Sequence, residues 1–192
     1  MKRISNMEDR EVVGTDGNLL GWVRGFTFPA VGDWRVTGVS LKMEKESHDE
    51  LGVKKPFLSG ALVDIAVEDI KNVSDNIILK LPQKGMKGHL KAHHQGKNIA
   101  NIIDKGVIDS DGKDLGTVTD VMVDTDGWRF PSIQIKLTKE VLAFLRMEKC
   151  PDCERSVLLP MGNVDSIGDK LILNISKEAM GDLVQKVPVK TM

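Results

Sequence analysis

Short apolar runs, separated by turns that contain aspartate and glycine, follow one another along the whole chain. Two of these turns are nearly the same: residues 16–21 read Asp-Gly-Asn-Leu-Leu-Gly, and residues 111–116, 95 positions later, read Asp-Gly-Lys-Asp-Leu-Gly. Each lies between two strand-like runs, which predicts a tight β-hairpin because glycine adopts positive φ at little steric cost. The second glycine of each motif, Gly21 or Gly116, falls inside a strand pattern and predicts a bulge or a sharp bend.

The segments around the two turns repeat as well. The pairs Trp34-Arg35 and Trp128-Arg129 each begin a predicted strand at matching positions. Later in each half, residues 69–79 align with residues 163–173 at an offset of 94. The repeat is found both early and late in each half, and its offset changes by only one residue, from 95 to 94. This agreement indicates a duplicated unit.

Several short strands punctuated by turns are typical of a sandwich or a barrel, and a small closed barrel suits units of this size. We therefore predict an all-β fold with short helices, arranged as two small β-barrels in tandem. The first barrel is expected at residues 1–81 and the second at residues 99–192. Residues 82–98 are rich in glycine and lysine and contain no acidic residue, so they are expected to be a basic linker.

Smaller elements are predicted from local patterns. Residues 1–10 are polar and are expected to be an irregular start, and the charged residues 42–56 are expected to form a loop. Apolar residues at helical spacing in residues 138–149 predict a helical insertion with Thr138 as its N-cap. Residues 176–185 predict a short C-terminal helix behind an N-cap serine.

Composition narrows the class of protein. Of the 192 residues, 41% are hydrophobic and 29% are charged, which is ordinary for a globular protein. Only 4% are aromatic and tyrosine is absent, so aliphatic cores are expected. A net charge of -1 argues against a polyanion as the main partner. No export signal and no membrane span are visible, so we expect a cytoplasmic location, and the two cysteines do not suggest a disulfide scaffold.

The apolar strand at residues 107–108, the Asp-Gly turn, the Leu-Gly pair and the following strand to Asp124 together resemble the PRC-barrel family. The segment from Val67 to Leu79 is similar to the closing element of that family. The resemblance implies a protein-binding adaptor rather than an enzyme. It is nearest to the archaeal stand-alone type, whose CdpB members act with SepF in FtsZ-based cell division.

Family members with a single barrel often form homodimers. The resemblance therefore implies either a homo-oligomer or a tandem chain that is an intramolecular pseudo-dimer. The RimM branch of the family gives a competing class, an RNA- or ribosome-associated factor. For that class the lysines of the basic linker would contact phosphates, although the linker has no aromatic residue for base stacking and nucleic acid is not the favoured partner.

Two sets of residues are candidates for contact with a partner. Trp34, Arg35, Trp128 and Arg129 are proposed because tryptophan and arginine are enriched at interface hot spots. The alternative for the tryptophans is packing in the core or at a barrel end. The second set is the apolar face of the predicted helical insertion, for which the alternative is packing on its own barrel: Val141, Leu142, Phe144 and Leu145.

The pair Cys150 and Cys153 has the spacing with which two thiolates share one zinc ion, and a structural zinc site needs four ligands. Closure would require histidines (His48, His89, His93 or His94) or the cysteines of another subunit. A redox pair and two plain reduced thiols are the alternatives. No other cofactor is expected. Residues 109–114 lack the spacing of an EF-hand and are interpreted as a turn, and no catalytic motif is visible, so we expect no enzyme activity.

Overall fold

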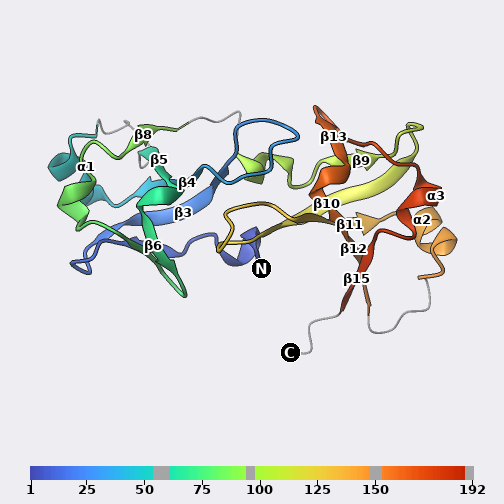
Figure 1. Ribbon diagram of the computed structural model, residues 1–192, viewed down its shortest axis with the longest axis horizontal. Helices are drawn as coiled ribbons and strands as arrows, with labels where there is room; N and C mark the ends of the chain where they lie inside the picture. The colour runs from blue at the N-terminus through green and yellow to red at the C-terminus, as the bar shows by residue number, and fades with distance from the viewer. Residues whose placement is uncertain (54–60, 94–97, 148–152, 189–192) are drawn as a thin grey trace.

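The chain forms two β-sheets of the same design, placed side by side along the long axis of the molecule (Figure 1). The structure, a computed structural model, describes residues 1–53, 61–93, 98–147 and 153–188. We call residues 8–93 barrel 1 and residues 103–188 barrel 2. The segments that precede them, residues 1–7 and residues 98–102, are arm 1 and arm 2.

The first sheet has the strand order β6-β7-β2-β3-β4-β5-β8. Its strands are β2 (Glu11–Val13), β3 (Leu19–Thr27), β4 (Gly38–Met43), β5 (Leu62–Ala66), β6 (Ile70–Val73), β7 (Ile77–Leu79) and β8 (Lys91–Ala92). The helices of barrel 1 are α1 (Lys45–Leu51) and the 3-10 turns η2 (Val67–Asp69) and η3 (Gln83–Met86).

The second sheet has the order β13-β14-β9-β10-β11-β12-β15, with β1 (Lys2–Arg3) of arm 1 added to β10. Its other strands are β9 (Gly106–Ile108), β10 (Asp114–Val123), β11 (Ser132–Leu137), β12 (Cys153–Pro160), β13 (Val164–Ile167), β14 (Leu171–Leu173) and β15 (Gln185–Pro188). The helices are α2 (Lys139–Phe144), α3 (Lys177–Met180) and η6 (Met161–Asn163); arm 1 contains η1 (Ile4–Asn6), and arm 2 contains η5 (Ile99–Ile102).

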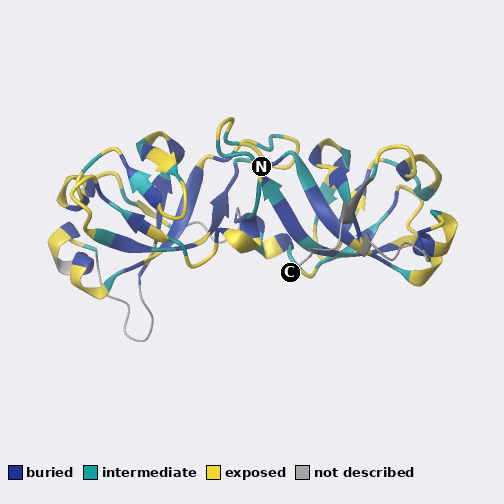
Figure 2. Cartoon of the chain, turned by 90° about the horizontal axis from the view of Figure 1, so that it is seen from below, coloured by how far each residue is buried: buried dark blue, intermediate teal, exposed yellow. Residues whose placement is uncertain are grey.

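Both halves therefore have the same elements in the same order. In each sheet one pair is parallel, β2 with β7 and β9 with β14, and the other pairs are antiparallel. Fully buried aliphatic residues occupy equivalent core positions, such as Val23 and Val118, or Leu41 and Ile135. Figure 2 shows buried strand segments in both halves. The predicted class, all-β with short helices, is confirmed. Within the described residues, each strand path remains open between its first and last strands.

The two predicted hairpins are present, and their glycines explain the bends of β3 and β10. Gly17 and Gly112 have φ of 76° and 80°, as the turns require. The strand register shifts beside Gly21 and at Gly116. A Cβ atom would lie 2.3 Å from the Lys42 carbonyl oxygen at Gly21 and 2.0 Å from that of Lys136 at Gly116, so the neighbouring strand approaches too closely for a side chain.

Three local predictions differ from the structure. The charged segment 42–56 contains helix α1, whose Ser47 and Leu51 are buried. Most of the predicted linker packs on barrel 1: Met86 is fully buried, and β8 pairs with β5. The Gln83 amide donates to the Leu19 carbonyl at 2.6 Å, so a charged and glycine-rich composition did not prevent this segment from folding onto the sheet.

The third difference is the start of the chain, predicted to be irregular. Arm 1 is ordered and crosses to barrel 2, where β1 pairs with β10 (Figure 1). Two apolar residues of the arm, Ile4 and Met7, are buried, and this burial stabilises a mostly polar segment.

The helix caps were predicted correctly. The Thr138 side chain accepts a hydrogen bond from the Val141 N–H at 3.3 Å, and the Ser176 side chain accepts one from the Ala179 N–H at 3.3 Å. The C-terminal helix is shorter than expected, ends at Met180, and is followed by strand β15. In the part of the chain that the structure describes, no helix has the length and apolar character needed to cross a membrane.

Candidate functional site

The two barrels meet along a short antiparallel contact, at the positions of the predicted Trp-Arg pairs. Arg35 and Arg129 face each other as an isolated β-bridge. The Val36 N–H donates to the Trp128 carbonyl at 2.7 Å, and the Phe130 N–H donates to the Trp34 carbonyl at 2.8 Å. Because the donors and acceptors occupy equivalent positions in the two halves, the contact has approximate two-fold symmetry.

The tryptophans are half-buried at this junction and pack against the core, while the two arginine side chains are 75% and 66% exposed. Arg35 pairs with Asp33 at 2.6 Å, and the hydrogen bonds that its guanidinium donates to this carboxylate raise the pKa of Arg35 above its ordinary value. Arg129 pairs with Asp124 at 3.1 Å. The structure thus brings the four predicted residues together. Their backbones join the two barrels, and the two guanidinium groups face solvent.

Aromatic side chains fill the junction beneath these pairs. The Phe28 ring of barrel 1 lies 5.6 Å from that of Trp34 and meets the Phe130 ring of barrel 2 edge-on at 6.4 Å. Phe130 is 2% exposed. Trp128 has φ of 45°, a left-handed conformation that is costly for a bulky residue, and the surrounding contacts must hold it there.

The arms join the barrels a second time, and they do so reciprocally. Arg3 of arm 1 pairs with Met122 of barrel 2, and Asn98 of arm 2 pairs with Thr27 of barrel 1. These two pairs occupy equivalent positions of the repeat. Figure 2 shows arm 1 between the two barrels. Each barrel therefore carries the arm of the other.

The first turn of each arm is capped by a different residue. In arm 1 the Ser5 N–H and hydroxyl donate to the Asp120 carboxylate of barrel 2, at 3.3 Å and 2.5 Å. In arm 2 the equivalent N–H, that of Ala100, donates to the side chain of Asn98 in the same arm, at 2.9 Å. The equivalent of Asp120 in barrel 1 is Gly25, and a Cβ there would lie 2.2 Å from the Asn98 Oδ1 atom. Barrel 2 supplies the capping side chain, Asp120, for arm 1. Barrel 1 has Gly25 at that position, which leaves space for the capping side chain of arm 2, Asn98.

This exchange of roles gives a first prediction. Gly25→Ala is expected to destabilise the protein by about 2 kcal/mol, because the new methyl group overlaps the Asn98 side chain and the backbone has positive φ. Asn98→Ala removes the overlapping atoms, so the double variant should lose less than the sum of the two single losses. Chemical denaturation of the four proteins measures this coupling, and strict additivity would contradict the assigned contact.

An open cavity of about 380 Å³ lies beside arm 2, between the β3–β4 loop of barrel 1 and the β13–β14 turn of barrel 2. Its walls include Phe28, Val31, Ile102 and Ile167, and Lys105 lies at its side. The Lys105 ammonium donates to the Gly168 carbonyl at 2.6 Å, so this charge already has a partner within the barrel.

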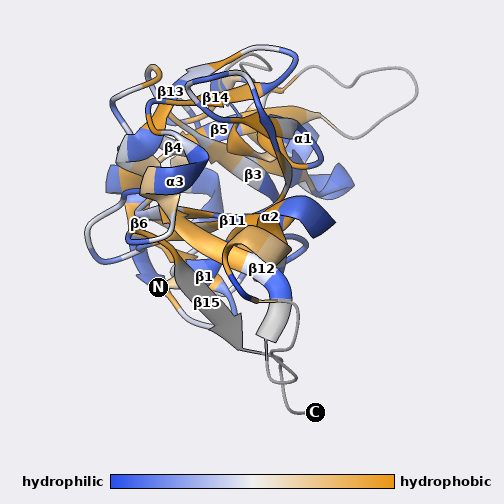
Figure 3. Cartoon of the chain, turned by 90° about the vertical axis from the view of Figure 1, so that its right-hand side faces the viewer, coloured by the Kyte–Doolittle hydropathy of each residue, from blue (hydrophilic) through white to orange (hydrophobic). Residues whose placement is uncertain are grey.

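The second set of predicted contact residues is divided by the structure. Val141 and Leu142 are buried in barrel 2 and Leu145 is half-buried against the core, so these side chains pack on their own barrel instead of facing a partner. Phe144 is 46% exposed, and the Lys177 ammonium lies 4.5 Å from its ring centre. Figure 3 faces this end of the molecule and shows α2 as a mostly hydrophobic turn. Only Phe144 of this set is available at the surface.

The zinc prediction is not addressed by the described side chains. Cys150 and His94 lie outside the described residues, and Cys153 begins β12, where its side chain is not described. His89 pairs with Asp69, and His93 pairs with the buried Asp64, each at 2.9 Å. Residues 1–53, 61–93, 98–147 and 153–188 contain no group of three potential metal-binding side chains.

Zinc analysis tests this prediction directly. If the cysteine pair binds zinc, the purified protein contains bound zinc that is lost in the Cys150→Ser/Cys153→Ser double variant, because thiolates are the expected ligands. The single variant His93→Asn serves as a control for the histidines. Equal zinc content in the wild type and the double variant would contradict a cysteine zinc site.

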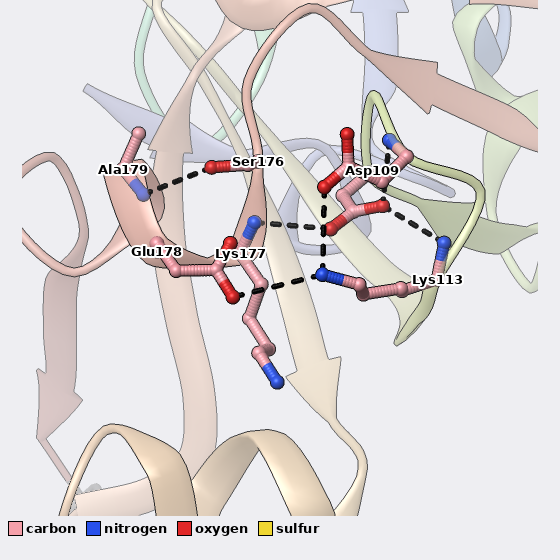
Figure 4. A network of polar contacts seen from close by, with 7 residues as sticks. Asp109, Lys113, Ser176, Lys177, Glu178 and Ala179 are labelled. Atoms are coloured by element: carbon pink, nitrogen blue, oxygen red, sulfur yellow. Dashed lines mark hydrogen bonds and ion pairs between the residues drawn. The ribbon is translucent and has the colours of Figure 1, made fainter.

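The turn at residues 109–114 is a structural turn and not a calcium loop. The buried Asp109 carboxylate accepts hydrogen bonds from the N–H groups of Asp111, Lys113 and Lys177, at 2.9, 2.8 and 3.0 Å (Figure 4). Burial acts to raise the pKa of Asp109, but these three donors hold it below its ordinary value. The equivalent position in barrel 1 is Gly14, and there Asp16 accepts from the Gln83 N–H at 3.2 Å.

A known family model matches the second half of the chain. Residues 94–180 match the family model of the PRC-barrel domain, in agreement with the predicted resemblance of this part of the chain to that family. Among solved structures, the chain is similar to the crystal structure of a proposed 16S ribosomal RNA processing protein, RimM, from Pseudomonas aeruginosa. The identity is 15% and the TM-score 0.31, over 81% of this chain and 98% of that chain, and no inference rests on so low a score. No curated protein matches the sequence.

The residues that the sequence interpretation missed are those of the arms. Ile4 and Met7 in arm 1, and Ile99 and Ile102 in arm 2, are all buried. The signal was present, because both pairs of apolar residues have the same spacing and lie 95 positions apart. Extending the repeat alignment to the first residues would have shown that the start of the chain is part of the repeated unit.

Proposed function

We propose that this protein is a non-catalytic adaptor that binds another protein through the joined surface of its two barrels. The observation that carries the proposal is the reciprocal junction. It holds two equivalent barrels in one fixed arrangement and presents the exposed arginines of the two Trp-Arg pairs next to each other. A partner that contacts both motifs gains affinity without a second association cost.

Charge reversal at the two arginines tests this surface. The double variant Arg35→Glu/Arg129→Glu is expected to weaken binding of the partner about tenfold or more, because exposed arginines are frequent hot spots. Its stability should remain within about 0.5 kcal/mol of the wild type, since both side chains are exposed. The matched control is Lys45→Glu/Lys139→Glu, which makes the same change in net charge at exposed positions on α1 and α2.

Affinity purification from the native host supplies the partner for this comparison. A protein retained by the wild type and by the lysine control, but lost by the arginine variant, supports the adaptor. If all three proteins retain the same partner equally, the Trp-Arg surface is not the binding site. If none retains any protein, the adaptor function itself is contradicted.

A role in FtsZ-based cell division with SepF as the partner is the finer form of this proposal, and it rests on the family resemblance. A pull-down with purified SepF, and separately with FtsZ, tests it. Binding that depends on Arg35 and Arg129 would support the division role. Absence of binding to both proteins, with normal division in a deletion strain, would contradict it.

Association with RNA is the competing function. At least one of the lysines that would contact phosphates lies among carboxylates. Lys84 pairs with Glu50 at 3.3 Å and lines the same hollow as Glu44 and Glu46. Phosphates approaching this lysine would also meet carboxylates, so we expect no salt-sensitive RNA binding. A filter-binding titration at two salt concentrations, with Lys84→Gln/Lys87→Gln/Lys91→Gln as the comparison, measures this. Salt-sensitive binding that the triple variant abolishes would favour the RNA function.

A further inference from the structure

Arm 1 occupies barrel 2 in the way a bound peptide would. Its strand β1 pairs with the C-terminal end of β10, with Lys2 opposite Val123 and Arg3 opposite Met122. Its 3-10 turn then places Ile4 and Met7 in the core. The Asp120 carboxylate, 4% exposed, receives the two hydrogen bonds from Ser5. This is a strand addition accompanied by buried side chains, a common mode of peptide recognition.

The chain joins the arm to barrel 1 at a strained residue, and the Lys2 ammonium of the arm also donates to the Val73 carbonyl of barrel 1 at 3.1 Å. Asp9 has φ of 59°, a left-handed conformation, and its N–H donates to the Val23 carbonyl at 3.0 Å. Asp104 follows arm 2 at the equivalent position, with φ of 65° and the equivalent hydrogen bond to Val118 at 2.9 Å. A change of the backbone angles at Asp9 would redirect the arm, and relief of the left-handed conformation favours that change.

The two arm sites differ in specificity. The site on barrel 2 offers a carboxylate to the turn of its arm, while the site on barrel 1 offers the space above Gly25 to an asparagine side chain. In arm 2 the Asn98 side chain itself caps the turn, so this arm does not require a residue such as Asp120. A carboxylate at the position of Gly25 would occupy the space that the Asn98 side chain fills. Arm 1, with Arg3 at the equivalent position, lacks a cap of its own and depends on Asp120. Each site therefore selects its own arm.

We propose that the surface of β10 around Asp120 is a peptide-binding site for an extended segment that ends in one 3-10 turn, and that it accepts arm 1 of a second copy of this chain. The contacts in trans are the same as those in cis, so the exchange requires no new surface. A tethered arm has an effective concentration on the order of millimolar, and its own arm fills the site in dilute protein. Exchange between two chains becomes visible when the tethered arm is weakened.

The test uses full-length chains and a fluorescent synthetic peptide of residues 1–9. Ile4→Asp disables the tethered arm and leaves the site intact. This variant is expected to bind the peptide about tenfold or more tightly than the wild type, because the wild-type arm competes for the site. Adding Asp120→Ala to Ile4→Asp should weaken binding about tenfold. The same change should weaken a Ser5→Ala peptide less, because that peptide has already lost the hydroxyl hydrogen bond and keeps only the one from its N–H.

Native mass spectrometry then tests whole chains. An equimolar mixture of the Ile4→Asp chain, which has a vacant site, and the Asp120→Ala chain, which has an intact arm, should form a heterodimer that neither chain forms alone. Ile4→Ala replaces Ile4→Asp if the aspartate prevents folding, as judged by circular dichroism. A folded arm variant that binds neither the peptide nor the second chain overturns the proposal.

Discussion

Phe130→Ala is expected to lower the free energy of unfolding by about 4 kcal/mol, as is typical for removal of a buried phenylalanine. The ring is 2% exposed and meets Phe28 of the other barrel, so the change leaves a cavity between the barrels and removes an edge-to-face contact. Chemical denaturation measures the loss. The variant should also show faster hydrogen exchange at the amides of residues 36 and 130, which donate across the junction.

Phe144→Ala is the matched control for that result. The same atoms are removed, but the ring is 46% exposed and contacts the Lys177 ammonium at the far end of barrel 2. A loss of about 1 kcal/mol or less is expected. Equal losses for the two variants would show that Phe130 does not join the barrels.

Asp109→Ala is expected to cost about 3 kcal/mol, because buried N–H groups that lose their acceptor each cost on the order of 1–3 kcal/mol. The carboxylate connects the β9–β10 turn to the start of α3 through the Lys177 N–H (Figure 4). Asp111→Ala is the control in the same turn. Its side chain is 54% exposed and contacts only the Lys113 ammonium at 3.4 Å among the contacts of the described residues, so its loss should be small.

The same carboxylate gives the stability a defined pH dependence. The pKa of Asp109 is lower in the folded chain than in the unfolded chain, so the folded state binds fewer protons. The stabilisation is complete above the unfolded pKa of about 4 and is lost as the pH falls through the folded pKa. Stability of the wild type should therefore decline more steeply below about pH 4 than that of Asp109→Asn. Parallel curves for the two proteins would contradict this role.

The hairpins, the two-part organisation and the helix caps could be predicted from the sequence because each depends on local chemistry. Asp-Gly turns require positive φ at Gly17 and Gly112, and Thr138 and Ser176 cap the turns that follow them. The buried aliphatic positions recur at a constant offset, so the core of one half indicates the core of the other.

The path of the arms could not be predicted from composition, since arm 1 is mostly polar, buries two apolar side chains and pairs with a strand far along the chain. The position of Trp34 and Trp128 depends on the same junction. Their sequence context gave the residue types suited to an interface, but the interface that they form lies between the two halves of one chain. Contacts of this kind are set by tertiary structure alone.

Compensation between the two halves was also hidden in the sequence. The turn of barrel 2 uses Asp109 to hold the following segment, whereas barrel 1 has glycine at that position and uses Asp16 for the equivalent N–H group. Asp120 and Asn98 divide the capping of the arms in the same manner. An alignment of the two halves shows these positions as mismatches, although the structure shows that the same backbone donors are satisfied in both.

Differential scanning calorimetry of the full-length protein tests most directly whether the reciprocal arms and the junction make the two barrels one cooperative body. We predict a single transition in which the calorimetric and van't Hoff enthalpies agree. Two resolved transitions, one for each barrel, or a calorimetric enthalpy about twice the van't Hoff value, would contradict the account.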